Sequence, residues 1–129
     1  MERIQIAATE KSPLVDFDPE SGIMLMQGRS LIEDTTAFYM PLVEWLKEYT
    51  NNPKSGTVFD FKYEYFNTSC SKWLITITKQ LKELYEKDPS TKVNWHYEDD
   101  DVLEYGEVIC DLVDMPINMI EEEVDEEDI

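Results

Sequence analysis

The sequence predicts one α/β domain in which helices pack against a mixed sheet. Along the chain, the apolar residues change between the alternating spacing of strands and the wider spacing of helices. Three expected strands come first, and three expected helices then alternate with three further strands, so the predicted order is β-β-β-α-β-α-β-α-β. Units of strand, helix and strand build parallel pairs through right-handed crossovers. The 129 residues, 42% of them hydrophobic, suffice for one such core.

The first three expected strands are short apolar segments over residues 3–8, 14–17 and 22–28. The segment DPESG joins the last two segments, and its turn-forming residues predict a hairpin.

The first expected helix runs from Glu33 to Tyr49, where apolar residues recur at helical spacing. Pro41 lies inside this range and has no N–H to donate. We therefore expect either a kink at Pro41 or a first turn that begins later than Glu33.

The segment TVFDFKYEYF, residues 57–66, is the clearest strand, because aromatic residues alternate with charged ones along it. A second amphipathic helix is expected to begin near Cys70 and to stop at Asp88 and Pro89. The chain then predicts a strand over 92–97.

The C-terminal third of the chain begins with an expected helix over 101–113, weakened by Gly106, and continues with a short strand over 116–120. We expect the domain to cover residues 1–121. Residues 122–129 carry a run of like charges and are expected to form a disordered acidic tail.

The charge balance excludes several classes of partner. The chain has 29 acidic and 11 basic residues, a net charge of -18, which disfavours binding to nucleic acid or to anionic membrane surfaces. No signal peptide or membrane span is visible, so we expect a soluble cytoplasmic protein. In that compartment Cys70 and Cys110 are expected to be reduced thiols.

The segment YFNTSCSKWL, residues 65–74, places small polar residues between the expected strand and helix. One of its residues is expected to cap the helix, a contribution of about 1 kcal/mol. A helix N-terminus also favours negative charge, so a phosphate on Thr68 would be stabilised there, with the Lys72 cation one turn further on. Asn67 opens a formal glycosylation sequon, but the expected compartment argues against its use.

A catalytic role for this segment would require a base near Thr68, Ser69 or Cys70. His96, the only histidine, could in principle serve, but its position in an expected strand between two aromatic residues favours a structural role. A single histidine also excludes a paired-histidine metal site. The chain has neither a nucleophile elbow nor a phosphate-binding glycine loop, so we expect no cofactor.

Five motifs in order resemble the SiaC family of bacterial regulatory phosphoproteins, over about residues 4–120. The motifs are ATEKSPLVDFDPESG, QGRS, FYMPLVEWLKEY, YFNTSCSKWL and VNWHYEDDD. Trp73, just after the NTS motif, and the acidic tail after Glu121 depart from the family pattern.

The resemblance implies a non-enzymatic switch with a fold like the sulfate-transporter and anti-sigma-antagonist (STAS) domain. The NTS threonine, here Thr68, is implied to be phosphorylated by a serine/threonine kinase with a histidine-kinase-like ATPase fold and dephosphorylated by a PP2C-type phosphatase. The unphosphorylated form is implied to bind and activate a diguanylate cyclase, which raises cyclic di-GMP and promotes biofilm formation. The loop expected to meet the partner around Thr68 comprises Asn67, Ser69, Cys70, Ser71 and Lys72.

Two alternatives stay open at this point. The first is an acidic protein–protein adaptor that is not phosphorylated. The second is a hydrolase that uses a hydroxyl or thiol of residues 68–71, which would require a deep pocket lined by His96 and Cys70.

Overall fold

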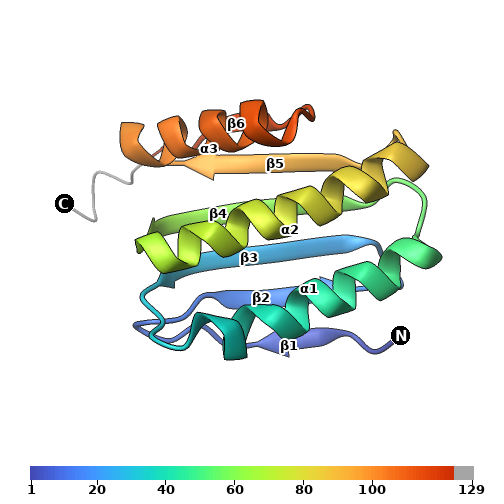
Figure 1. Ribbon diagram of the computed structural model, residues 1–129, viewed down its shortest axis with the longest axis horizontal. Coiled ribbons are helices and arrows are strands. Elements are labelled where there is room, and N and C mark those ends of the chain that lie inside the picture. Colours follow the sequence, from blue (N-terminus) through green and yellow to red (C-terminus); the bar gives the residue numbers. More distant parts are fainter. Residues whose placement is uncertain (124–129) are drawn as a thin grey trace.

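In the computed structural model, residues 1–123 are described, and they form one sheet with a layer of helices on one face (Figure 1). The order of strands in the six-stranded sheet is the order in the chain, from β1 to β6. The elements are β1 Ile4–Ile6, β2 Leu14–Asp18, β3 Ile23–Ser30, α1 Thr35–Asn51, β4 Val58–Phe66, α2 Thr68–Lys87, β5 Lys92–Tyr97, α3 Asp100–Val113 and β6 Asn118–Glu121.

The sheet has an antiparallel and a parallel half. Strands β1, β2 and β3 pair antiparallel, whereas β3, β4, β5 and β6 pair parallel, with one helix between each successive pair. The predicted mixed α/β fold and its order of elements are therefore confirmed. Because parallel strands point the same way, the carboxyl ends of β3, β4 and β5 and the starts of the three helices lie at one edge of the sheet (Figure 1).

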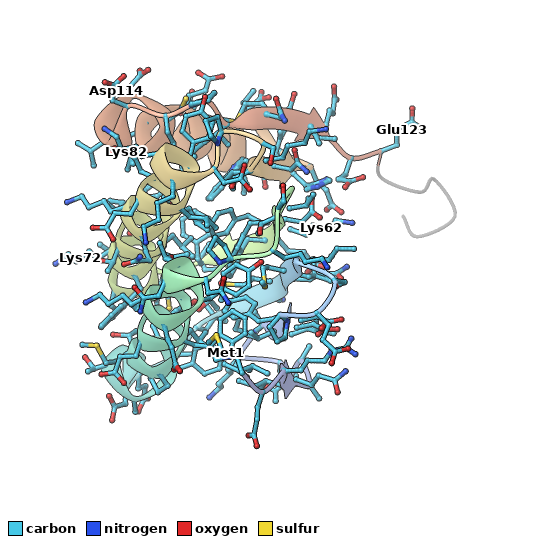
Figure 2. All side chains as sticks on the ribbon, turned by 90° about the vertical axis from the view of Figure 1, so that its right-hand side faces the viewer. Met1, Lys62, Lys72, Lys82, Asp114 and Glu123 are labelled. Atoms are coloured by element: carbon cyan, nitrogen blue, oxygen red, sulfur yellow. The ribbon has the colours of Figure 1, made fainter. Side chains whose placement is uncertain are left out.

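Strand β4 shows how the sequence pattern produces the two layers. Phe59, Phe61 and Tyr63 are buried beneath the helices, while Asp60 and Lys62 point to the opposite, helix-free face of the sheet. Figure 2 shows the helices on one side of the sheet and Lys62 on the other. The core between the layers consists of apolar side chains from the strands and all three helices, including Phe17, Met24, Leu42, Leu46, Leu74, Leu81 and Trp95.

Element boundaries depart from the expected ones by a few residues. Helix α1 begins at Thr35, because Asp34 caps it by accepting a hydrogen bond from the N–H of Ala37. The first turn thus begins later than Glu33, and Pro41 lies within the helix. Helix α2 begins two residues earlier than expected, at Thr68, because Asn67 is its cap.

Gly106 has a packing role that its helix propensity does not reveal. A Cβ atom at Gly106 would lie 2.4 Å from Cδ1 of Trp95, so only glycine lets α3 approach the Trp95 ring. The indole N–H of Trp95 donates to the carbonyl of Val102, at 2.8 Å. The residue that weakens the helix intrinsically is therefore the one that allows it to pack.

The C-terminal part of the described chain continues the sheet. The N–H of Glu122 donates to the carbonyl of Tyr97 at 2.8 Å, one residue after β6. Of the acidic tail expected over 122–129, residues 124–129 lie outside the described residues.

Within residues 1–123, no helix combines the length and the apolar character needed to cross a membrane. Both cysteines are free thiols, as predicted.

Candidate functional site

The junction between β4 and α2 positions the polar cluster of the NTS motif. Asn67 has an extended backbone, and its side-chain oxygen accepts from the N–H of Cys70 at 2.9 Å. Its backbone N–H donates to the carbonyl of Ser30, at 3.0 Å. The cap is therefore bonded both to the helix that it opens and to the end of the neighbouring strand β3.

A buried chain of hydroxyl and thiol groups lies beneath this first turn. The Ser30 hydroxyl donates to the Cys70 sulfur at 2.9 Å and lies 2.6 Å from the Tyr39 hydroxyl, which is 3.1 Å from that of Tyr63. Burial raises the pKa of Tyr39 to about 12 and raises the pKa of Tyr63 well above its usual value. Both phenols stay neutral at physiological pH and connect α1, β3, β4 and α2.

The structure separates the candidate residues of the loop into two groups. Cys70 and Ser71 are buried, and the Ser71 hydroxyl donates to the carbonyl of Thr68 at 2.6 Å. Thr68 and Ser69 are exposed. The Ser69 hydroxyl is 3.4 Å from the Asn67 side chain, whereas the Thr68 hydroxyl has no hydrogen bond to any of the described residues 1–123. Thr68 thus combines an exposed position with an unengaged hydroxyl.

The electrostatic surroundings of Thr68 favour an anion. The first turn of α2 contains no acidic residue, and Asn67 is a neutral cap, so the partial positive charge of the helix N-terminus is not offset locally. Lys72 follows Thr68 by four positions, which places the two side chains next to each other on the helix surface. Figure 2 shows Lys72 on the helix side of the molecule, away from the sheet.

His96 lies on the opposite face of the sheet from Cys70. Its Nε2 is 2.9 Å from Oδ1 of Asp60 and its Nδ1 is hydrogen-bonded to Glu122, so the ring ties β4 and the end of β6 across β5. Cys70 belongs to the helix layer and is fully buried. The pair that a hydrolase would need is therefore separated by the sheet.

Two groups of bonded residues were not expected from the sequence. The contacts of His96 with Asp60 and Glu122 depend on the pairing of three strands, although the polar positions of β4 and β5 were visible as alternation. The contact of Ser30 with Cys70 joins residues 40 positions apart, and no local pattern signals it.

Comparisons with known proteins agree with this architecture. The model of the SiaC family regulatory phosphoproteins matches residues 6–122. An uncharacterized protein of Pseudomonas aeruginosa (strain UCBPP-PA14) is 24% identical over 98 residues, which are 76% of this chain and 78% of that protein.

Solved structures share the fold at low sequence identity. The crystal structure of apo-SiaC from Pseudomonas aeruginosa has a TM-score of 0.84 at 23% identity and covers 93% of this chain and 99% of that one. SiaC from the same organism, in complex with the diguanylate cyclase SiaD that it activates, matches with a TM-score of 0.84 at 22% identity, over 92% of this chain and 99% of that one. With the family model matching nearly the whole described chain, the protein belongs to the SiaC family of regulatory phosphoproteins.

Proposed function

We propose that this protein is a non-enzymatic partner switch controlled by phosphorylation of Thr68. In its unphosphorylated form it binds and activates a diguanylate cyclase, as SiaC of Pseudomonas aeruginosa is an activator of SiaD. A serine/threonine kinase with a histidine-kinase-like ATPase fold adds the phosphate, and a PP2C-type phosphatase removes it. The observation that carries the proposal is the exposed, unbonded hydroxyl of Thr68 at the first position of α2.

A phosphate on Thr68 would be stabilised where it forms. It adds close to two negative charges and three acceptor oxygens at a helix N-terminus without carboxylates, next to the ammonium group of Lys72. The same charge opposes a partner that contacts the loop, because it must be desolvated or repelled on binding. The phosphate therefore acts as an off switch.

The backbone of the loop that carries Thr68 is held in place by bonds to strand β3. The bonds of Asn67 and Cys70 to Ser30 hold the first turn against β3, so a phosphate on Thr68 changes the charge of a surface whose backbone is already ordered. Ser71 is buried and bonded, which supports Thr68 over Ser71 as the modified residue.

The test uses the purified chain and a diguanylate cyclase encoded in the same genome. Binding is measured by calorimetry for wild type, Thr68→Ala and Thr68→Asp, and for Thr36→Asp as control, because Thr36 is also an exposed threonine at the start of a helix. We expect Thr68→Ala to bind like wild type, Thr68→Asp to bind at least tenfold more weakly, and Thr36→Asp to change affinity less than twofold. Equal affinities for all four chains, or no binding by wild type, would overturn the proposal. Mass spectrometry of protein from its native cells locates the phosphate.

A further inference from the structure

The ring of His96 lies between two carboxylates on the helix-free face of the sheet. Its Nε2 is 2.9 Å from Oδ1 of Asp60 on β4, and its Nδ1 is hydrogen-bonded to Oε1 of Glu122, the residue after β6. An ionised carboxylate can only accept a hydrogen bond, so the ring satisfies both contacts only when both of its nitrogens carry protons. The imidazolium form is therefore the one that joins β4 to the end of β6.

Two side-chain amides connect the start of β6 to the same aspartate. The amide nitrogen of Asn118 donates to the side-chain oxygen of Asn94 at 3.0 Å, and the amide nitrogen of Asn94 donates to Oδ1 of Asp60 at 2.9 Å. Neither amide titrates. The start of β6 is thus attached through neutral bonds, whereas its end is attached through a ring that can gain or lose charge.

Glu122 fixes the end of β6 with both its backbone and its side chain. Strand β6 has four residues, lies at the edge of the sheet and pairs with β5. The N–H of Glu122 donates to the carbonyl of Tyr97 at 2.8 Å, and its carboxylate bonds to His96. We call Asp60, His96 and Glu122 the histidine latch.

One cavity, of about 250 Å³, gives solvent access to the latch. The His96 side chain is 11% exposed. The charged side chains that line the cavity beside the ring are Lys62 and Glu64 of β4, Glu98 after β5, and Glu122 and Glu123 after β6. Strand β3 contributes the neutral Gln27, and the helices lie on the other face of the sheet (Figure 2). The ring can therefore exchange a proton with water while β4, β5 and β6 stay paired.

We propose that the histidine latch makes the attachment of β6 sensitive to pH. When the ring releases one proton to the solvent, one nitrogen presents a lone pair to an ionised carboxylate, and that contact becomes unfavourable. The attachment is therefore present while the ring carries both protons and is lost as pH rises. Imidazole groups in peptides lose this proton near pH 6.5, so the response falls close to neutrality.

Loss of the latch opens the end of β6 and leaves its start in place, because the bonds of Asn118 and Asn94 do not depend on the ring. The edge of β5 near Tyr97 then becomes available for pairing. Thr68 lies at the start of α2 and shares no hydrogen bond with the latch among the described residues. The inference goes beyond the proposed function and does not depend on it.

The experiment follows the ring and the strand together in the purified chain. Because His96 is the only histidine, the imidazole signals in an NMR titration report on this ring alone. Amide hydrogen exchange is measured at pH 5.5, 7.0 and 8.5 and expressed as protection factors. We expect protection of the Glu122 amide to fall at least tenfold between pH 5.5 and 8.5, in parallel with the loss of the ring proton. The amide of Ile77, buried in α2, reports global unfolding and should change less than twofold.

Two variants separate the latch from a purely structural contact. His96→Gln cannot titrate, so protection of its Glu122 amide should be low and should change less than twofold over the same pH range. Glu122→Gln is paired with Glu121→Gln, because Glu121 is exposed and has no side-chain hydrogen bond within residues 1–123. At pH 5.5, Glu122→Gln should lower protection of the residue 122 amide at least fivefold, with Glu121→Gln within twofold of wild type.

Three results would overturn the inference. Protection of the wild-type Glu122 amide could be the same at pH 5.5 and 8.5 although the ring loses its proton. Glu122→Gln could behave like Glu121→Gln. Protection of Ile77 could fall together with that of Glu122, which would mean that the whole domain opens rather than the end of β6.

Discussion

Helices α2 and α3 begin with the same backbone arrangement and with opposite electrostatics. Each follows a strand, and each has an extended cap residue whose side-chain oxygen accepts an N–H three residues later, at 2.9 Å: Asn67 from Cys70 and Asp99 from Val102. The α3 cap is a carboxylate, and Asp100 and Asp101 follow it. The α2 cap is neutral, and its first turn has no acidic residue.

The difference shows which helix start can accept an added anion. At α3 the carboxylates already offset the partial positive charge of the helix N-terminus, so another negative group there would meet repulsion. At the start of α2 no carboxylate offsets the partial positive charge of the helix N-terminus, so this charge can stabilise an added anion. In an acidic chain, the absence of carboxylates from one helix start is therefore the informative feature.

The side chains that hold the starts of α2 and α3 in place differ in whether they titrate. We therefore expect the two helix starts to respond differently to alkaline pH, and this is the largest effect among our predictions. The first turn of α2 rests on the Tyr39 hydroxyl, whose pKa is raised by burial to about 12, whereas Trp95 anchors α3 with a group that does not titrate in this range. Because the folded pKa exceeds the unfolded value, this stabilisation is complete below pH 10 and is lost as pH rises through 12, by roughly 3 kcal/mol.

Chemical denaturation at several pH values tests this expectation. Wild type should lose stability between pH 10 and 12, and Tyr39→Phe should lose less over the same interval. Hydrogen exchange should show the amide of Cys70 becoming exposed before that of Val102. An equal loss for wild type and Tyr39→Phe would contradict the assignment to Tyr39.

Gly106→Ala should break the attachment of α3 and leave the start of α2 in place. Alanine raises helix propensity by about 1 kcal/mol, but its Cβ would lie 2.4 Å from the buried Trp95 ring, and overpacking of this kind costs about 1–3 kcal/mol or more. The cost of the clash should exceed the gain in helix propensity, so Gly106→Ala should have a lower Tm than wild type in thermal unfolding. Thr76→Ala, at an exposed position of α2, is the control and should change stability by less than about 0.5 kcal/mol.

Removal of each cap compares the two helix starts directly. Asn67→Ala and Asp99→Ala each remove a hydrogen bond to a first-turn N–H, and each should cost about 1 kcal/mol. Denaturant midpoints measure both losses. Under the proposed function, Asn67→Ala should also weaken binding to the cyclase, because the cap orders the loop proposed to meet the partner, while Asp99→Ala should not.

Exchange of the cap charges gives the smallest and most specific effect. Asn67→Asp should stabilise the protein by about 0.3–1 kcal/mol at low ionic strength, and Asp99→Asn should destabilise it by a similar amount. Both changes should shrink in high salt. If Asn67→Asp lowered the free energy of unfolding, the inference that the start of α2 can stabilise an added negative charge would be wrong.

The sequence predicted most of the fold because each element has a strong local pattern. Alternation along residues 57–66 predicts a strand, and the helical spacing after Cys70 predicts a helix, without any information about the elements that pack against them. The order of the elements then limited the topology. Boundaries were less accurate at the helix starts, since Asn67, Thr68 and Ser69 all suit a cap and only the bond to Cys70 distinguishes Asn67. The placement of all three helices on one face was not predicted.

The candidate site was predictable in position but not in detail. Turn residues between a strand and a helix located the cluster, and the carboxyl edge of the sheet exposed it. That Ser71 is buried while Ser69 is exposed follows from how α2 rotates against β3 and β4, which the sequence does not state. The bonds of His96 to Asp60 and Glu122 required strand registers that no local pattern contains.

Because the strands follow one another across the sheet in chain order, each element packs mainly on those synthesised just before it. On the ribosome, β4 can therefore add to a sheet already begun by β1, β2 and β3, and α2 can close over it before β5 is made. The Ser30 contacts that hold the NTS turn all come from residues made by Cys70. A truncated chain that ends after α2 should therefore already form the hydrogen-bonded turn of the NTS motif, with Asn67 and Cys70 bonded to Ser30.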